Sequence, residues 1–248
     1  MADDIAQQHE SFRRFFWIAT IFTVPAIVVM CALGTWQIQR LAWKEDVIAR
    51  MDARLDATPV ALPVAIDDLA DWEYRKVVLA GRFDHSRELH LFGIQPGTGK
   101  AGYFIFAPLM RGDGPAVLVN RGWVDRRQRH ITSRAEQLTT ETVSFEGIVR
   151  LSQQKIPMGA ENSPSTNDWY YPDLQGMAMA AGLDPVSPAF VYATTPAGGG
   201  DAQPVPARIE VVNNHLAYVF TWFSMATVLA IIYGIFLRRQ YRQSKSED

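Results

Sequence analysis

Two long stretches without a charged side chain, one near each end, are the strongest constraint on how this chain can fold. They cover residues 15–39 and 211–237, which is 25 and 27 residues. About 20 apolar residues are enough to cross a bilayer as a helix. We therefore predict transmembrane helices at residues 15–35 and 213–237, with residues 1–14, 36–212 and 238–248 outside the bilayer.

The first stretch could also belong to a cleaved signal sequence, since it follows Arg13 and Arg14. Signal sequences have apolar regions of roughly 7–15 residues and end in a small-x-small cleavage site. The stretch in this chain is longer and no such site ends it. We therefore expect it to be retained as a membrane anchor.

Positive charges around the second stretch predict the orientation of the chain. Only Arg208 lies close before this stretch, whereas Arg238, Arg239, Arg242 and Lys245 follow it. Cytoplasmic flanks carry the excess of Lys and Arg, so both termini are predicted to be cytoplasmic. The N-terminal sequence MADDIAQQHE is acidic, unlike an Arg-rich transit peptide. The expected location is a bacterial inner membrane, with residues 36–212 in the periplasm.

Net charge and cysteine content exclude several functions. A formal net charge of -2 gives no electrostatic case for nucleic-acid binding. The single cysteine, Cys31, lies inside the first apolar stretch, so residues 36–212 contain no thiol and no disulfide. Thiol catalysis and thiolate metal sites are therefore excluded there. No phosphate loop, dinucleotide fingerprint or serine elbow appears, and we predict that the protein is not an enzyme.

The region between the two stretches has the pattern of a β-rich domain. Short segments rich in Val, Phe, Tyr and Ile are separated by Gly, Pro and Asp, at residues 74–83, 87–93, 103–110, 116–124, 142–150 and 189–194. We predict an antiparallel β-sheet or barrel-like domain with a few helices, including 43–55 and 172–182, in a membrane protein of the α+β class. The Gly-rich segment 196–206 is predicted to be a flexible insert that need not pack.

His215 stands at the start of the second stretch, within NNHLAYVFTWFSMA. On a helix with about 100° between residues, Tyr218 and Trp222 lie on the same side as His215. The imidazole could coordinate haem iron, with apolar and aromatic area beside it. It could also hydrogen-bond a lipid headgroup or the outward domain, since aromatic residues are common at membrane interfaces. Asn213 and Asn214 are expected to cap the helix.

Trp36, Gln37 and Arg40 mark the outer end of the first stretch. Anchoring at the membrane interface is one interpretation, because Trp and Arg suit that environment. In the alternative, the ends of both spans meet and these residues face His215. Gln37 would then orient the imidazole through a hydrogen bond to its second nitrogen.

The sequence RGWVDRRQRH gathers four arginines, namely Arg121, Arg126, Arg127 and Arg129. Three interpretations compete for them: contact with a haem propionate, contact with anionic lipid, or an ordinary solvated loop. Arg121 is the best candidate for ligand contact because it lies in a predicted strand beside Trp123.

Several strings of this sequence resemble the Surfeit locus protein 1 family. They are LGTWQIQRLAWKEDVI at the end of the first stretch, YRKVVLAGRF, VLVNRGWV, GIVR, and NNHLAYVFTWFSMA at the start of the second. The strings extend from residue 33 to residue 226 and occur in the order expected for this family, between two terminal spans.

The resemblance implies an assembly factor for haem-copper cytochrome c oxidase. Such a factor would bind haem a transiently and assist its insertion into the large membrane subunit of the oxidase, with His215 as the iron ligand. The implied partners are that subunit, the enzyme of haem a synthesis and membrane lipid, without nucleic acid. The alternative is a cofactor-free membrane scaffold that stabilises oxidase subunits during assembly.

Overall fold

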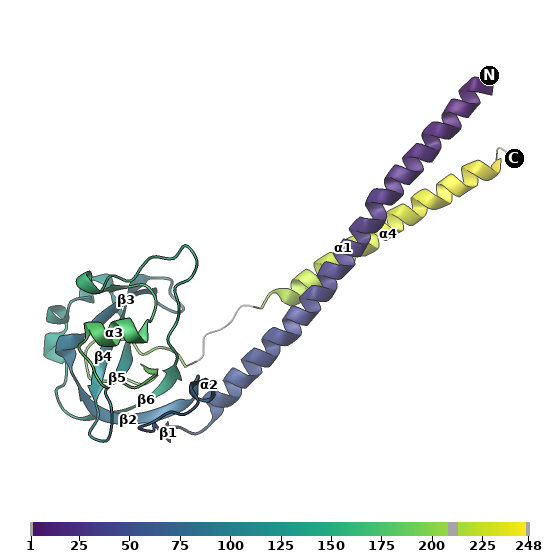
Figure 1. Ribbon diagram of the computed structural model, residues 1–248. Helices are drawn as coiled ribbons and strands as arrows, with labels where there is room; N and C mark the ends of the chain where they lie inside the picture. Colours follow the sequence, from purple (N-terminus) through teal and green to yellow (C-terminus); the bar gives the residue numbers. More distant parts are fainter. Residues whose placement is uncertain (1, 208–212, 247–248) are drawn as a thin grey trace. The chain divides into compact units, whose positions relative to one another are not determined.

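The computed structural model of the protein describes residues 2–207 and 213–246. They form two compact units, which divide between Ala49 and Arg50 and again within residues 208–212 (Figure 1). We call these units the helix pair and the central unit. The helices are α1 (Ala2–Asp56), α2 (Leu69–Trp72), α3 (Leu174–Ala180) and α4 (His215–Ser246), and the strands are β1 (Val60–Ala61), β2 (Lys76–Phe83), β3 (Leu89–Ile94), β4 (Ala101–Met110), β5 (Val117–Asp125), β6 (Val143–Arg150), β7 (Asp168–Trp169) and β8 (Phe190–Ala193).

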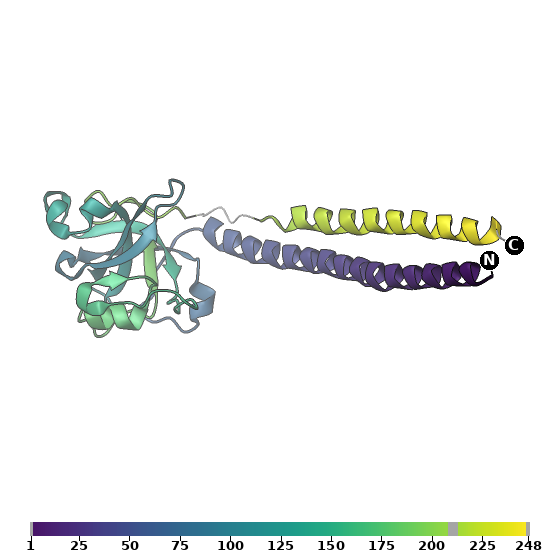
Figure 2. The same cartoon turned by 90° about the horizontal axis from the view of Figure 1, so that it is seen from above.

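The helix pair consists of α1 up to Ala49 and of α4, which lie side by side and run antiparallel (Figure 2). The ring centroids of Phe15 and Phe236 are 5.7 Å apart, and the hydroxyls of Thr20 and Tyr233 share a hydrogen bond of 2.7 Å. Both helices are long and apolar enough to cross a membrane, which suggests membrane association. The second apolar stretch starts at residues 211 and 212, outside the described residues, and α4 begins at His215.

Helix α1 continues well beyond residue 35, where we placed the end of the first span. It is a single helix of 55 residues, or about 80 Å at 1.5 Å per residue, whereas the hydrocarbon core of a bilayer is about 30 Å thick. Its last turns belong to the central unit, where Leu55 is buried and Arg54 donates to the backbone oxygens of Ala70 and Glu73. The helix expected at residues 43–55 is therefore a continuation of the first span.

Gly34→Leu is expected to push the two helices apart. A Cβ atom at Gly34 would lie 2.8 Å from Cε2 of Phe223 in α4, and overpacking of a tight contact typically costs about 1–3 kcal/mol. The measurement is disulfide cross-linking between Thr20→Cys and Tyr233→Cys in a Cys31→Ala background, which should fall at least about fivefold. Gly234→Leu is the control, because a Cβ there meets no atom within 4 Å. Equal cross-linking in both variants would contradict this packing.

The central unit is built on one eight-stranded sheet with the order β1-β2-β6-β8-β5-β4-β3-β7 and an additional β2–β4 pairing. All six predicted strands are present as β2, β3, β4, β5, β6 and β8. The expectation of an antiparallel sheet was wrong, since β1–β2, β3–β7 and β5–β8 pair in parallel and the sheet is mixed. The long connection from β5 to β8, which includes α3, lets these two strands run in the same direction.

Two apolar cores fill the central unit. One lies between strands and includes Val77, Leu109 and Val191. The other lies where α3 covers Leu118 and Phe190 (Figure 1). Helix α3 was predicted from its caps, and both are present. The carboxylate of Asp173 accepts a hydrogen bond from the backbone N–H of Gly176, and Gly182 follows the helix with a φ of 61°.

The Gly-rich segment 196–206 packs against the sheet, so the expectation of an insert that need not pack was wrong. Trp123 and Gln203 exchange two backbone hydrogen bonds of 2.8 Å, and Ala197 is buried. Gly198, Gly199 and Gly200 have φ values of 76°, 73° and 79°. Glycine adopts this left-handed conformation without a steric penalty, and the chain thereby turns carbonyl oxygens towards the side chain of Arg121.

Candidate functional site

His215 and Gln37 meet in the helix pair, although 178 positions separate them in the sequence. His215 is the first residue of α4 and is half-buried, while Gln37 of α1 is buried with 9% of its surface exposed. Nδ1 of the imidazole lies 2.7 Å from the amide oxygen Oε1 of Gln37. This contact is the geometry that we proposed from sequence for the case in which the ends of the two spans meet.

The contact determines which imidazole nitrogen is available to a ligand. An amide oxygen can only accept a hydrogen bond, so Nδ1 of His215 is the donor. In the neutral ring, Nε2 then carries a lone pair. Among the described residues, Gln37 is the only hydrogen-bond partner of this ring. A neutral imidazole held through one nitrogen, with the other free, suits an axial ligand of haem iron.

The other predicted site residues of the helix pair lie around this contact in different environments. Trp36 and Tyr218 are each 53% exposed. Arg40 is exposed, with its guanidinium 3.9 Å from the ring centre of Trp43. Trp222 is partly buried. Further along the same stripe of α4, Ala226 is buried and the hydroxyl of Tyr233 shares a hydrogen bond with that of Thr20 in α1. The part of this face at Ala226 and Tyr233 is therefore used for helix packing, whereas Tyr218 next to His215 is exposed.

Of the two asparagines predicted to cap α4, Asn213 does not do so. The side-chain oxygen Oδ1 of Asn213 is buried and has no hydrogen-bond partner in the part of the chain that the structure describes, so it does not cap the helix. The first turn is closed instead by the backbone, where N–H of Tyr218 donates to the carbonyl oxygen of Asn214 at 3.3 Å.

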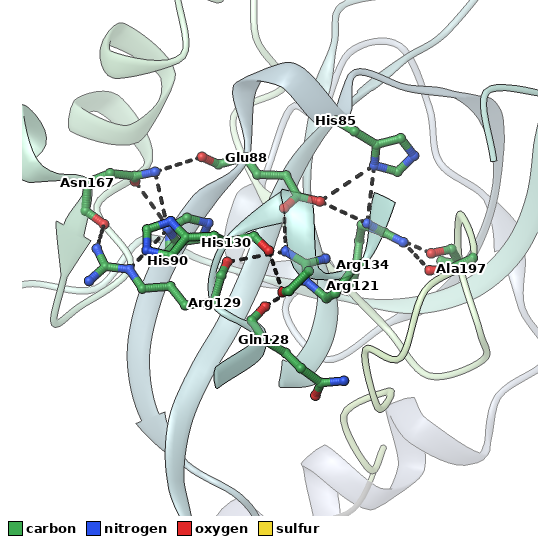
Figure 3. Close-up of polar contacts among 12 residues, drawn as sticks. His85, Glu88, His90, Arg121, Gln128, Arg129, His130, Arg134, Asn167 and Ala197 are labelled. Carbon is green, nitrogen blue, oxygen red and sulfur yellow. Dashed lines mark hydrogen bonds and ion pairs between the residues drawn. The ribbon is translucent and has the colours of Figure 1, made fainter. Parts of the chain in front are cut away.

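Arg121 lies in β5 of the central unit, where its side chain has no exposed surface. Its Nε donates to the carbonyl oxygen of Ala197 at 2.9 Å, and its Nη2 donates to that of Gly199. Its Nη1 lies 3.0 Å from Oε1 of Glu88 and 3.2 Å from Nδ1 of His85 (Figure 3). These contacts occupy the guanidinium on every side, so the predicted propionate contact has no surface on which to form. The four arginines of residues 121–130 therefore do not form one ligand-binding cluster, because Arg121 is buried whereas Arg126 and Arg127 are exposed.

The SURF1 family profile matches residues 24–227 of the chain. The chain belongs to the SURF1 family. Among its relatives, Surfeit locus protein 1 of Mus musculus is 33% identical over 248 residues, covering 94% of this chain and 78% of the mouse protein. The Homo sapiens protein of the same name is 32% identical over 233 residues, covering 88% of this chain and 75% of the human protein.

A further relative of this SURF1-family chain is named for what it assembles. Cytochrome oxidase assembly protein SHY1 of Saccharomyces cerevisiae is 32% identical over 201 residues, which cover 77% of this chain and 50% of the yeast protein. The profile match includes both Gln37 and His215. The family resemblance predicted from sequence is thereby confirmed.

Glu88 connects two buried arginines in the central unit of this SURF1-family chain. Only 3% of its side chain is exposed, and its two oxygens lie 3.0 Å from Nη1 of Arg121 and 2.6 Å from Nη2 of Arg134 (Figure 3). Burial alone would raise the pKa of Glu88, but contacts from His85 and Arg134 and the charges of both arginines hold this pKa below its usual 4.5. Sequence analysis missed this cluster, because nothing in the local pattern distinguishes Glu88 or Arg134 from exposed residues.

His90 lies beside this cluster and is buried, with 8% of its surface exposed. Its Nδ1 accepts a hydrogen bond of 3.4 Å from Nε of Arg129, and its Nε2 has no partner among the described residues. Burial, together with the charge of Arg129, lowers the pKa of His90 from 6.5 to about 4. The folded protein therefore favours the neutral ring. No group of three or more His, Cys, Asp or Glu that could hold a metal ion occurs in the described part of the chain.

Acidification should destabilise the central unit through His90. The unfolded chain binds a proton on this residue below pH 6.5, whereas the folded chain does so only near pH 4. Stability present above pH 6.5 is therefore lost as the pH falls towards 4, by up to about 3 kcal/mol. Hydrogen exchange of β3 peptides in the detergent-solubilised chain measures this loss. His90→Gln should flatten the pH dependence, and an unchanged slope in this variant would assign the effect to other groups.

Proposed function

We propose that the chain is a membrane-anchored assembly factor for cytochrome c oxidase that binds haem a and passes it to the large membrane subunit. Membership of the SURF1 family and the printed name of the yeast relative support the role in oxidase assembly. The hydrogen bond between Gln37 and His215 carries the haem proposal, because it leaves Nε2 free for iron. Both termini would lie in the cytoplasm and residues 36–212 in the periplasm of a bacterium.

The helix pair offers one nitrogen ligand and a polar and aromatic rim for such a cargo. His215 would hold the iron through Nε2, while Trp36, Trp222 and Tyr218 would contact the apolar ring. Arg40, which is exposed three residues after Gln37 on α1, would pair with a propionate at the water boundary. Haem a supplies redox chemistry only once it is installed in the oxidase, so no catalytic group is required in this chain.

Transfer of the cargo requires a site that binds it and also releases it. A single axial histidine on the outer part of a helix pair suits moderate affinity, since the receiving site in the oxidase can provide further contacts. The chain therefore works as a carrier and not as an enzyme. Its expected partners are the large oxidase subunit, which receives the haem, and the enzyme that produces haem a.

Purification of the full chain from cells that synthesise haem a tests this function. The detergent-solubilised protein should show a haem absorption spectrum and should co-purify with the large oxidase subunit. Co-purification of that subunit without any pigment, also after incubation with added haem a, would favour the cofactor-free scaffold. Pigment without any oxidase subunit would support haem binding and contradict the assignment of the oxidase as receiver.

A further inference from the structure

We propose that Gln37 is a positioning residue, which selects the proton-bearing nitrogen of His215 and thereby presents Nε2 to the cargo. This inference rests on the proposed haem-binding function and adds to it the group that controls the ligand. The observation behind it is the hydrogen bond of 2.7 Å between Nδ1 of His215 and Oε1 of Gln37.

The orientation of the Gln37 amide decides whether His215 can act as a ligand. A glutamine can present its carbonyl oxygen or its NH2 group to a neighbour. The oxygen accepts from Nδ1–H and leaves the lone pair on Nε2. The NH2 group would instead donate to Nδ1, so that the proton of the neutral ring would sit on Nε2 and block coordination. The structure presents the oxygen.

Gln37 is held where it can perform this selection. It is buried, with 9% of its surface exposed, on the face of α1 that contacts α4. Three residues before it, Gly34 contacts the ring of Phe223, which brings the helix axes close together at this level. A polar group held in this way restricts both the tautomer and the rotation of the imidazole. Removal of a residue that hydrogen-bonds and orients a metal ligand typically weakens metal binding by 10–100-fold.

Two substitutions of similar size separate positioning from packing. Gln37→Met keeps the length of the side chain and removes the acceptor, while Gln37→Glu keeps an acceptor and removes the NH2 group. Gln39→Met is the matched control, because Gln39 is exposed two residues further along α1. All variants are made in the full chain and studied in detergent.

The first measurement needs no haem. Nitrogen NMR of the ¹⁵N-histidine-labelled full chain, with the His215 signal assigned by comparison with His215→Ala, reports which ring nitrogen carries the proton. We expect the Nδ1–H tautomer in the wild-type chain, in Gln37→Glu and in Gln39→Met. Gln37→Met should lose this single tautomer. A proton on Nε2 in the wild-type chain would overturn the inference.

The second measurement uses added haem a. Gln37→Met should bind it about 10–100-fold more weakly than the wild-type chain. Gln37→Glu should retain binding and lower the haem reduction potential, because a stronger acceptor makes the imidazole more electron-rich. Wild-type affinity and potential in both Gln37 variants would overturn the positioning role.

The two proposals can fail separately. If His215→Ala keeps haem a bound, the ligand assignment of the proposed function fails, whatever the NMR result. If His215→Ala loses haem a while the Gln37 variants match the wild-type chain in tautomer, affinity and potential, haem binding stands and the role of Gln37 fails.

Discussion

Glu88→Gln is expected to lower the free energy of unfolding of the central unit by about 3–5 kcal/mol, which is typical when one partner of a buried ion pair is removed. The carboxylate lies between Arg121 and Arg134, whose side chains are both 0% exposed. Glutamine fills nearly the same volume, so the loss would come from two guanidinium groups left without a counter-charge. Hydrogen exchange of β3 and β5 peptides in the full chain measures it.

The same substitution should also loosen the segment 196–206. Arg121 joins Glu88 to the backbone oxygens of Ala197 and Gly199, so a change at Glu88 reaches this segment through one side chain. Faster exchange of its amide protons is therefore expected along with that of β5. Glu141→Gln is the control, because Glu141 is exposed in the same unit and should change stability by less than about 0.5 kcal/mol. A loss below about 1 kcal/mol for Glu88→Gln would contradict the importance of the buried charge.

Local sequence pattern predicted the strands well because alternation and turn residues are local signals. The six predicted strands and α3 were confirmed, including the cap at Asp173. The two-residue strands β1 and β7 were not predicted, since two residues show no periodicity. The parallel pairings also escaped prediction, because they depend on how distant segments return to the sheet.

For the candidate site residues too, the local sequence predicted the secondary structure but not the contacts that distant residues make. Arg121 was correctly placed in a strand, yet its burial depends on Glu88 and on Ala197, 33 and 76 positions away. The packing of the Gly-rich segment could not be inferred from its composition, because glycine favours both flexible linkers and left-handed turns. The contact between Gln37 and His215 was anticipated from topology alone, because two spans joined by one domain have their outer ends on the same side of the membrane. Their role in binding haem stays a prediction.

His215→Ala is expected to weaken haem a binding by more than about 100-fold, since loss of the ligand should exceed the effect of losing a group that only orients it. In the helix pair, the contact of His215 with Gln37 leaves Nε2 as the free nitrogen, and alanine removes both nitrogens without adding bulk. The measurement is titration of the detergent-solubilised full chain with haem a, followed by its absorption spectrum. His130→Ala serves as the control, because His130 is an exposed histidine of the central unit and should bind haem a like the wild-type chain.

His215→Met distinguishes loss of a ligand from loss of structure. A thioether can also coordinate haem iron and raises its reduction potential, so this variant should regain part of the affinity with a higher potential than the wild-type chain. A histidine that only hydrogen-bonded Gln37 to join α1 and α4 would give a different result. In that case His215→Met and His215→Ala would behave alike, and both would lower the cross-linking between Thr20→Cys and Tyr233→Cys. Retention of haem a by His215→Ala with an unchanged spectrum would exclude His215 as the iron ligand.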